Sequence, residues 1–374
     1  MHWLRPGFFG GCLPWLRAKT LRACPGLPTF TLVMRSSSLR DARSFMRKAT
    51  PRRVANGLQV VASYMVSRLT GRARAWGLPV AMSFEPTTSC NLRCPECPSG
   101  LRSFTRPTGM LPAKLFRKTM DEVASRLWYL IFYFQGEPYL HPEFLDLVEY
   151  ASKKGLYTAT STNAHFLNDD NARRTVESGL DRLIISLDGT TQEVYQQYRV
   201  GGKLEKVLAG TRNVVKWRKQ LKSSTPRIIF QFLVVRPNEH QIEDAKALAD
   251  ALGVDDVWFK TAQIYDYQQG SPLIPTIDYY SRYQNNGNGT FSLKNKLVNG
   301  CWKMWHSCVV TWDGKVVPCC FDKDAEYRLG DSQHESFQAL WHGQKYQGFR
   351  QALLKGRDQI EMCRNCTEGT KVWG

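Results

Sequence analysis

The chain lacks the features of a membrane-spanning, a disordered or a secreted disulfide-rich protein. It has no apolar run of the roughly 20 residues that a membrane span needs, and no unbroken apolar core of about 7–15 residues that would make a secretory signal. With 43% hydrophobic and 22% charged residues over 374 positions, it can bury a large core. Eleven cysteines are too few for a disulfide scaffold of this length, and nine of them cluster at 90–97, 301–320 and 363–366. The clustering favours metal sites in a reducing compartment and predicts a cytoplasmic or matrix-located protein.

Acidic residues are scarce only near the N-terminus. Residues 1–76 hold fourteen Lys or Arg and one acid, Asp41, so they carry 14 − 1 = +13 of the net charge of +18. The +5 left for the remainder is ordinary. Because no basic stripe interleaved with aromatic residues follows, we predict no nucleic-acid substrate.

The basic region, 1–77, begins with about 45 Arg-rich residues interrupted by Gly and Pro, which predicts poor order. An organellar transit peptide has this composition, and so does translated sequence upstream of a start at Met34 or Met46. Cys12 and Cys24 in this segment are interpreted as incidental.

One amphipathic helix is predicted at the end of the basic region. Thr50 is placed to cap it, and Pro51 suits its first turn. We expect the helix to pack against the main domain, and we consider contact with a membrane surface the less favoured alternative. Its other face is basic, and its apolar stripe consists of Val54, Leu58, Val61, Met65 and Leu69.

Short apolar runs alternate with helical stretches from residue 79 to about 262. Six such units predict an α/β fold, a partial (β/α)6 TIM-like barrel over 78–262, with its chemistry at the C-terminal ends of the strands. A connecting segment, 263–300, precedes a C-terminal region, 301–374. The expected strands are 79–85, 128–134, 156–161, 181–187, 227–235 and 255–261, and the expected helices lie near 113–126, 142–154, 169–178, 203–221 and 239–252.

A cysteine triplet with C-x3-C-x2-C spacing, Cys90, Cys94 and Cys97, follows the first expected strand. Three thiolates on one loop suit three irons of a 4Fe–4S cube and leave the fourth iron open to another ligand. A zinc site or a disulfide set is the alternative. Zinc more commonly uses paired C-x2-C motifs, and completing it here would need a ligand from elsewhere in the chain.

The triplet resembles the signature of the radical S-adenosylmethionine (radical SAM) enzymes, whose barrel has the cluster loop after strand one. The resemblance implies that SAM chelates the open iron and is cleaved to a 5'-deoxyadenosyl radical. One departure concerns the residue before the third cysteine, where the family usually has an aromatic side chain near the adenine. This chain has Glu96 there.

The same resemblance implies SAM contacts at later strand ends. Gln135, Gly136 and Glu137 resemble the family's GGE motif, which holds the methionine amino group, with Gln135 in place of its first glycine. Each match has a structural alternative. Gly136 and Glu137 could form a plain strand-to-helix turn, and the polar residues at the third and fourth strand ends could be a helix cap and a turn. Arg199 could be a surface arginine. The remaining residues matched to SAM contacts are Ser161, Thr162 and Asn163, then Ser186, Asp188 and Gly189, and Arg199, matched to an arginine that pairs with the SAM carboxylate.

The C-terminal cysteines begin at Cys301, in a stretch that predicts two short strands joined at Asp313 and Gly314. A helical stretch near 336–355 follows. The cysteine pattern resembles the front part of the SPASM extension of radical SAM enzymes, or its shortened twitch form, and implies one auxiliary 4Fe–4S cluster. A structural zinc ribbon is the alternative. The ligands chosen for the auxiliary cluster are Cys301, Cys319, Cys363 and Cys366, with Cys308 and Cys320 left over as substitutes.

The resemblance implies a two-cluster radical SAM oxidoreductase that takes electrons from a low-potential flavodoxin or ferredoxin. The single auxiliary cluster and the spacing of its cysteines resemble an aminocyclitol dehydrogenase more than the sulfatase-maturing enzymes. This resemblance favours a small hydroxylated, carbohydrate-like substrate. Peptide or protein modification is the first alternative, and a non-enzymatic iron–sulfur or zinc protein is the second. Alcohol oxidation also needs a base near pH 7, for which the unranked candidates are His165, His141, Tyr133 and Gln231.

Overall fold

The structure, a computed structural model, describes residues 36–295 and 297–367. The strands of the main sheet are β1 Ala81–Phe84, β2 Tyr129–Ile131, β3 Tyr157–Thr162, β4 Arg182–Ser186, β5 Arg227–Val234, β6 Asp256–Thr261, β9 Ser307–Val310, β10 Lys315–Val317 and β11 Gly330–Asp331. A separate hairpin consists of β7 Tyr283–Asn285 and β8 Phe291–Leu293. The α-helices are α1 Ser36–Arg47, α2 Pro51–Thr70, α3 Pro98–Leu101, α4 Ala113–Val123, α5 Phe144–Lys153, α6 Asp169–Glu177, α7 Gln192–Tyr198, α8 Leu204–Gln220, α9 Ile242–Leu252, α10 Lys303–His306, α11 Phe337–His342, α12 Gln344–Gly356 and α13 Glu361–Arg364.

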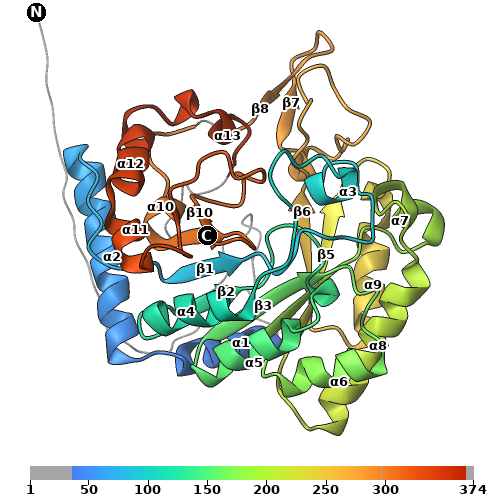
Figure 1. The fold of residues 1–374 in the computed structure, drawn as a ribbon. Helices are drawn as coiled ribbons and strands as arrows, with labels where there is room; N and C mark the ends of the chain where they lie inside the picture. The colour runs from blue at the N-terminus through green and yellow to red at the C-terminus, as the bar shows by residue number, and fades with distance from the viewer. Residues whose placement is uncertain (1–35, 296, 368–374) are drawn as a thin grey trace, which may run out of the picture. The chain divides into compact units, whose positions relative to one another are not determined.

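The main sheet is an open, mainly parallel sheet with the strand order β11-β10-β9-β1-β2-β3-β4-β5-β6 (Figure 1). Strands β1 to β6 run parallel in chain order, with helices between successive strands. The α/β partial barrel predicted from the sequence is therefore confirmed.

Strand register separates a helix-covered face from a polar face. Because side chains alternate along a strand, Cα partners on neighbouring strands share a face. Met82, Leu130 and Ile185 lie on one face and are fully buried. On the other face, Ser186 and Gln231 are in register near the C-terminal strand ends. β4 and β5 therefore present polar side chains where the sequence predicted the chemistry.

The predicted C-terminal hairpin is present, but its position was not predicted. β9 and β10 pair antiparallel through a turn in which Gly314 has a positive φ, and β9 pairs parallel with β1. The C-terminal region thus extends the barrel sheet. Two other differences are found: the helical stretch near 336–355 is two helices interrupted at Gly343, whose ψ of 166 is extended, and the connecting segment contains the hairpin of β7 and β8.

The expectation of poor order through about residue 45 is wrong for α1. The Asp41 carboxylate accepts hydrogen bonds from Tyr157 and Arg182, and it forms an ion pair with Arg227 at 3.2 Å. These partners begin β3, β4 and β5, so α1 contacts the N-terminal ends of the strands. Composition alone could not show these long-range contacts. Residues 1–35, including Cys12 and Cys24, lie outside the described residues.

Replacement of Asp41 should destabilise the fold. Asp41→Ala would leave Arg182 and Arg227 largely buried without this counter-charge, and breaking a buried ion pair costs about 3–5 kcal/mol. We expect the free energy of unfolding, measured by urea denaturation, to fall by about 3 kcal/mol. Asp244→Ala, at an exposed position of α9, is the control and should stay within about 0.5 kcal/mol of the unsubstituted protein. Equal stability of the two variants would contradict this account of α1.

Helix α2 begins as predicted but packs through the opposite face. The Thr50 side chain accepts a hydrogen bond from the Arg53 backbone N–H, and Pro51 is the first helical residue. Contact with the main domain is present, yet four residues of the apolar stripe are exposed, from 43% at Val54 to 83% at Leu69. Within the described residues, no helix is both long and apolar enough to cross a membrane.

Candidate active site

The cysteine triplet lies on the loop between β1 and α3. Cys94 is 5% exposed, whereas Cys90 and Cys97 are half-buried. A side chain at Gly100 would lie 2.6 Å from the Cys94 backbone nitrogen, so this close loop requires glycine. Burial raises the pKa of the Cys90 thiol to about 11 and also raises that of Cys94. The thiolates therefore need compensating positive charge, which iron ligation supplies.

Glu137, after β2, is held by the next strand end. Its carboxylate accepts hydrogen bonds from the Thr162 hydroxyl at 2.7 Å and the Asn163 backbone N–H at 2.8 Å. The side chain is 2% exposed, and burial raises its pKa to about 7. Two strand ends that are 25 residues apart in sequence thus form one polar site.

Asn163 connects this site to the triplet loop. Its amide nitrogen donates to the Asn91 side-chain oxygen at 2.8 Å and lies 4.0 Å from the Cys90 sulfur. Ser161, in β3, and Ser186, the last residue of β4, lie on the polar face of the sheet. Of these residues, Asn163 is the one that contacts the cysteine loop directly, and it brings the β3 end and the bound Glu137 beside that loop.

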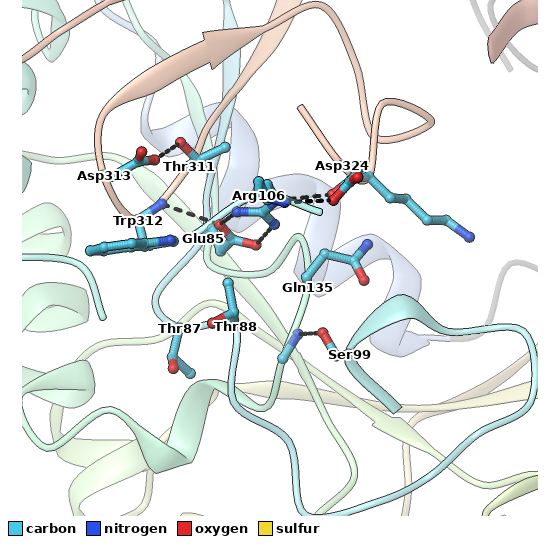
Figure 2. Close-up of polar contacts among 12 residues, drawn as sticks. Glu85, Thr87, Thr88, Ser99, Arg106, Gln135, Thr311, Trp312, Asp313 and Asp324 are labelled. Carbon is cyan, nitrogen blue, oxygen red and sulfur yellow. Dashed lines mark hydrogen bonds and ion pairs between the residues drawn. The ribbon is translucent and has the colours of Figure 1, made fainter. Parts of the chain in front are cut away.

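Gly136 is required by its backbone conformation and by close contact. Its φ is +75°, and a Cβ would collide with the Thr87 carbonyl oxygen. Its N–H donates to the Ser99 hydroxyl at 2.9 Å, a contact drawn in Figure 2. The β2 loop is thereby fixed against the loop that carries the triplet.

Gly136→Ala should disrupt the site more than a typical loop substitution, because both the positive φ and the collision oppose the methyl group. We expect the Kd for SAM, measured by anaerobic equilibrium dialysis, to rise by about 10- to 100-fold, as for other losses of outer support at a metal site. Gly201→Ala is the matched control, because Gly201 has a φ of +82° and open space around its Cβ position. Equal Kd values for the two variants would contradict a supporting role for Gly136.

Asp188 and Arg199 form an ion pair directed at the triplet. The Arg199 Nε lies 2.5 Å from Asp188 Oδ2, and its Nη1 lies 3.7 Å from the Cys94 sulfur. The other Asp188 oxygen accepts from the Leu233 backbone N–H at 2.7 Å. Asp188 is fully buried with both carboxylate oxygens engaged. The structure therefore places Asp188 as a support for Arg199, and Arg199 as a positive charge beside Cys94.

A buried ion pair that sequence reasoning missed joins the barrel to the C-terminal region (Figure 2). Glu85 accepts two hydrogen bonds from the Arg106 guanidinium, at 2.8 and 2.5 Å, and one from the Trp312 backbone N–H at 3.2 Å. The Arg106 Nε donates to the Lys323 carbonyl oxygen at 3.2 Å. Glu85 directly follows β1, and Trp312 lies in the β9–β10 turn, so the pair fixes both regions against the triplet loop.

Lys323 is a second residue that sequence reasoning missed. Burial lowers the pKa of its ammonium group, while the Cys97 and Cys320 thiols and Glu96 are near enough to raise it. Its Nζ lies 4.7 Å from the centre of the Tyr265 ring. Its position three residues after the Cys319–Cys320 pair was the available signal. The Gln135 side-chain oxygen is 3.9 Å from the Cys97 sulfur.

The four cysteines chosen for the auxiliary cluster line one cavity. They come from the segment before α10, the segment after β10, and α13 with the residues that follow it. Arg357 also lines this cavity, and its Nη2 donates to the Cys366 sulfur at 3.2 Å. Burial raises the pKa of the Cys363 thiol to about 12, and the Arg357 guanidinium acts in the opposite direction. The four are Cys301, Cys319, Cys363 and Cys366.

The two leftover cysteines lie elsewhere. Cys308 is a buried residue of β9, and Cys320 is exposed. Neither lines the cavity shared by the other four. Across the part of the chain that the structure describes, no three Cys, His, Asp or Glu side chains converge as ligands of one ion would. A 4Fe–4S cube takes one thiolate at each separate iron, whereas a zinc ion needs its four ligands around one atom.

Two of the four general-base candidates, His141 and His165, are hydrogen-bonded to backbone groups through Nε2. The Nε2 of His141 pairs with the Leu111 carbonyl oxygen at 2.8 Å, and the Nε2 of His165 accepts from the Lys203 backbone N–H at 2.8 Å. Burial raises the pKa of Tyr133, so its hydroxyl stays protonated near pH 7 and cannot accept the substrate proton there. Gln231 lies half-buried on the polar face of β5 and has no basic group near that pH.

Comparison with known proteins identifies the class of protein that this fold and cysteine arrangement define. Residues 84–251 match the Radical SAM superfamily, and residues 301–367 match SPASM, an iron–sulfur cluster-binding domain. The chain belongs to the Radical SAM superfamily and carries a C-terminal SPASM domain, as the sequence predicted. It is a radical SAM enzyme that binds a 4Fe–4S cluster and SAM, and that needs a reductant and a substrate. Its SPASM domain binds auxiliary iron–sulfur clusters.

Among individual proteins, the chain is similar to the AdoMet-dependent heme synthase of Methanosarcina barkeri, with 30% identity over 315 residues, or 77% of this chain and 87% of that protein. It is 27% identical over 297 residues to the tungsten-containing aldehyde ferredoxin oxidoreductase cofactor-modifying protein of Pyrococcus furiosus, which covers 71% of this chain and 82% of that protein. The structure of Streptococcus suis SuiB bound to S-adenosylmethionine aligns with a TM-score of 0.57 at 12% identity, covering 73% of this chain and 68% of SuiB. At this identity the likeness establishes the fold alone.

Proposed function

We propose that this protein is a two-cluster radical SAM oxidoreductase that oxidises a small hydroxylated compound. The observation that carries the proposal is the segment from Cys319 to Lys323. Cys319 lines the auxiliary cavity. Lys323 lies over the ring of Tyr265, whose backbone N–H donates to Glu96, the residue before Cys97 of the triplet. Five consecutive residues therefore lead from the auxiliary cavity towards the triplet loop, which supports a substrate position beside Lys323.

The residues around Lys323 favour a polar substrate. The Lys323 ammonium can bind an anionic or hydroxyl group, and the Gln135 amide lies beside Cys97. Ser186 and Gln231 add hydroxyl and amide groups to the polar face of the sheet. This lining suits a carbohydrate-like alcohol better than an apolar compound.

The chain's own residues would hold the reacting groups in place. In this proposal Cys90, Cys94 and Cys97 hold the first 4Fe–4S cluster, and the cavity cysteines hold one auxiliary 4Fe–4S cluster. When bound, the cluster and SAM would supply a 5'-deoxyadenosyl radical to take a hydrogen atom from the carbinol carbon. The auxiliary cluster would take the remaining electron, and the hydroxyl proton would pass to solvent water. Arg199 offsets negative charge at Cys94, and Glu137 orders the β3 end. Flavodoxin or ferredoxin in the cytoplasm or an organelle matrix is the proposed reductant.

A deuterium-transfer assay tests the proposal. Reconstituted protein, SAM and reduced flavodoxin would be incubated anaerobically with aminocyclitols and sugars deuterated at the carbinol carbon. We expect deuterium in 5'-deoxyadenosine and an equal amount of ketone. Lys323→Met should reduce ketone formation but leave the slow SAM cleavage without substrate unchanged. Unlabelled 5'-deoxyadenosine with no ketone from every alcohol would contradict the proposed substrate class.

Peptide or protein modification is the second candidate. Mycofactocin maturase MftC of Mycobacterium ulcerans is 30% identical over 175 residues, which covers 47% of this chain and 45% of that protein. If the substrate is a peptide, the same assay with peptides deuterated at Cα or Cβ should label 5'-deoxyadenosine while the alcohols do not.

A further inference from the structure

Helix α2 presents an apolar face to solvent, whereas the face it packs against the protein mixes the apolar Val60 and Tyr64 with Arg53, Asn56, Ser63 and Ser67. Leu58 is 67% exposed and Met65 50% exposed, and Val54 and Leu69 lie on the same side of the helix at spacings of three or four residues. A helix of a globular protein ordinarily buries such a stripe, and an exposed contiguous apolar patch marks an interaction site. We name this patch of Val54, Leu58, Val61, Met65 and Leu69 the α2 stripe.

The buried face of α2 is fixed by specific polar contacts. The Arg53 guanidinium donates to the carbonyl oxygens of Lys48 and Gly155 at 2.6 Å each and to that of Ala124 at 3.0 Å. The Asn56 amide bonds both the N–H and the carbonyl of Leu78, each at 2.9 Å. These contacts hold the helix in one rotation, so the α2 stripe cannot turn inward without breaking them.

The charged residues along the chain within and on either side of α2 are all positive. From residue 42 to residue 84 the sequence contains no Asp or Glu, and residues 54–67 contain no charge of either sign. Arg47 and Arg52 are exposed near the N-terminal end of the helix, and Arg68, Arg72 and Arg74 are exposed near its C-terminal end. Within the described chain, none of these five arginines forms an ion pair. The stripe is thus an uncharged apolar strip with basic ends.

We propose that the α2 stripe binds the surface of an anionic lipid bilayer, with α2 lying parallel to the membrane plane. A helix of 20 residues is about 30 Å long, and its Leu and Met side chains would enter the boundary between headgroups and acyl chains. Arg47 and Arg52 at one end and Arg72 and Arg74 at the other would contact anionic headgroups, each contributing about a fivefold gain in partition. Arg68 is directed instead at Tyr64 on the packed face. α2 lies at the edge of the fold beside α11 and α12 (Figure 1), so this attachment leaves the cysteine loop outside the lipid contact.

Vesicle co-sedimentation of the full-length, cluster-loaded protein tests this inference. We expect binding to vesicles of phosphatidylcholine with phosphatidylglycerol, weaker binding to phosphatidylcholine alone, and loss of most binding between about 0.1 M and about 1 M salt. The double variant Leu58→Glu with Met65→Glu should bind anionic vesicles at least tenfold more weakly. Leu58→Gln with Met65→Gln, which adds no charge, should shift binding in the same direction.

The matched control is Leu221→Glu with Tyr279→Glu, which adds the same charge at exposed apolar positions outside α2. This control should bind anionic vesicles more tightly than the α2 variant does, and it should keep the iron content of the wild-type protein. Three results would overturn the inference: no sedimentation of the wild-type protein with anionic vesicles, equal binding by the α2 and control variants, or a wild-type dimer that only the α2 variant converts to monomer. The last result would assign the stripe to a second copy of the chain.

Discussion

Cys94→Ala is expected to abolish the formation of 5'-deoxyadenosine from SAM and to lower the iron content from about eight to about four per chain. Cys94 is the most buried sulfur of the triplet, and Arg199 contacts it directly. Without its thiolate the cluster loses one of only three protein ligands. Because even outer-shell changes reduce activity by about 10- to 100-fold, the loss of a direct ligand should exceed about 100-fold.

The measurement combines anaerobic iron and sulfide analysis with chromatographic detection of 5'-deoxyadenosine under dithionite. Cys308→Ala is the matched control. Cys308 is also buried, but it lies in β9, outside the triplet loop and outside the cavity lined by the four auxiliary cysteines. It should retain about eight irons and SAM cleavage. If Cys94→Ala retained SAM cleavage, the assignment of the radical-generating cluster would be wrong.

Cys363→Ala is expected to separate the two clusters functionally. It should also lose about four irons, yet retain 5'-deoxyadenosine formation to within about tenfold, because the triplet and its supporting contacts are untouched. Ketone formation should fall to background, since the substrate radical would have no adjacent electron acceptor. The measurement is the ratio of ketone to 5'-deoxyadenosine in the same anaerobic reaction.

Cys320→Ala tests the ligand choice, because Cys320 adjoins Cys319 in sequence but is exposed. It should keep the full iron content. If instead Cys363→Ala left iron unchanged and Cys320→Ala removed it, the auxiliary ligand set would need revision. Loss of SAM cleavage in Cys363→Ala would mean that the two cysteine groups do not act as separate sites.

The candidate site was predictable where chemistry depends on residues that are close in sequence. The spacing of Cys90, Cys94 and Cys97 indicates a cluster loop without knowledge of the fold, because loop length limits which ions the thiolates can share. The pairing of Asp188 with Arg199 was not predictable, although both residues were singled out. Sequence spacing shows which strand end a residue occupies, but not which partner its side chain meets.

Helix α2 shows the same limit for packing. Its start at Thr50 and Pro51 follows from local capping and propensity, which sequence contains. The periodicity of Leu58 and Met65 predicts an apolar face but does not show which face is buried. That depends on carbonyl oxygens from distant segments, such as Gly155, that bind Arg53.

The sequence by itself determined the α/β class, the parallel strand order of the six barrel units and the superfamily. These follow from periodicity, strand-to-helix alternation and cysteine spacing, all of which depend on short stretches of chain. Only the tertiary structure decided that β9 pairs with β1, that Glu85 and Arg106 join the two regions, and that Lys323 lies over the ring of Tyr265. Each of these contacts joins segments from 21 to more than 200 residues apart, and their geometry is set by the packing of the whole fold.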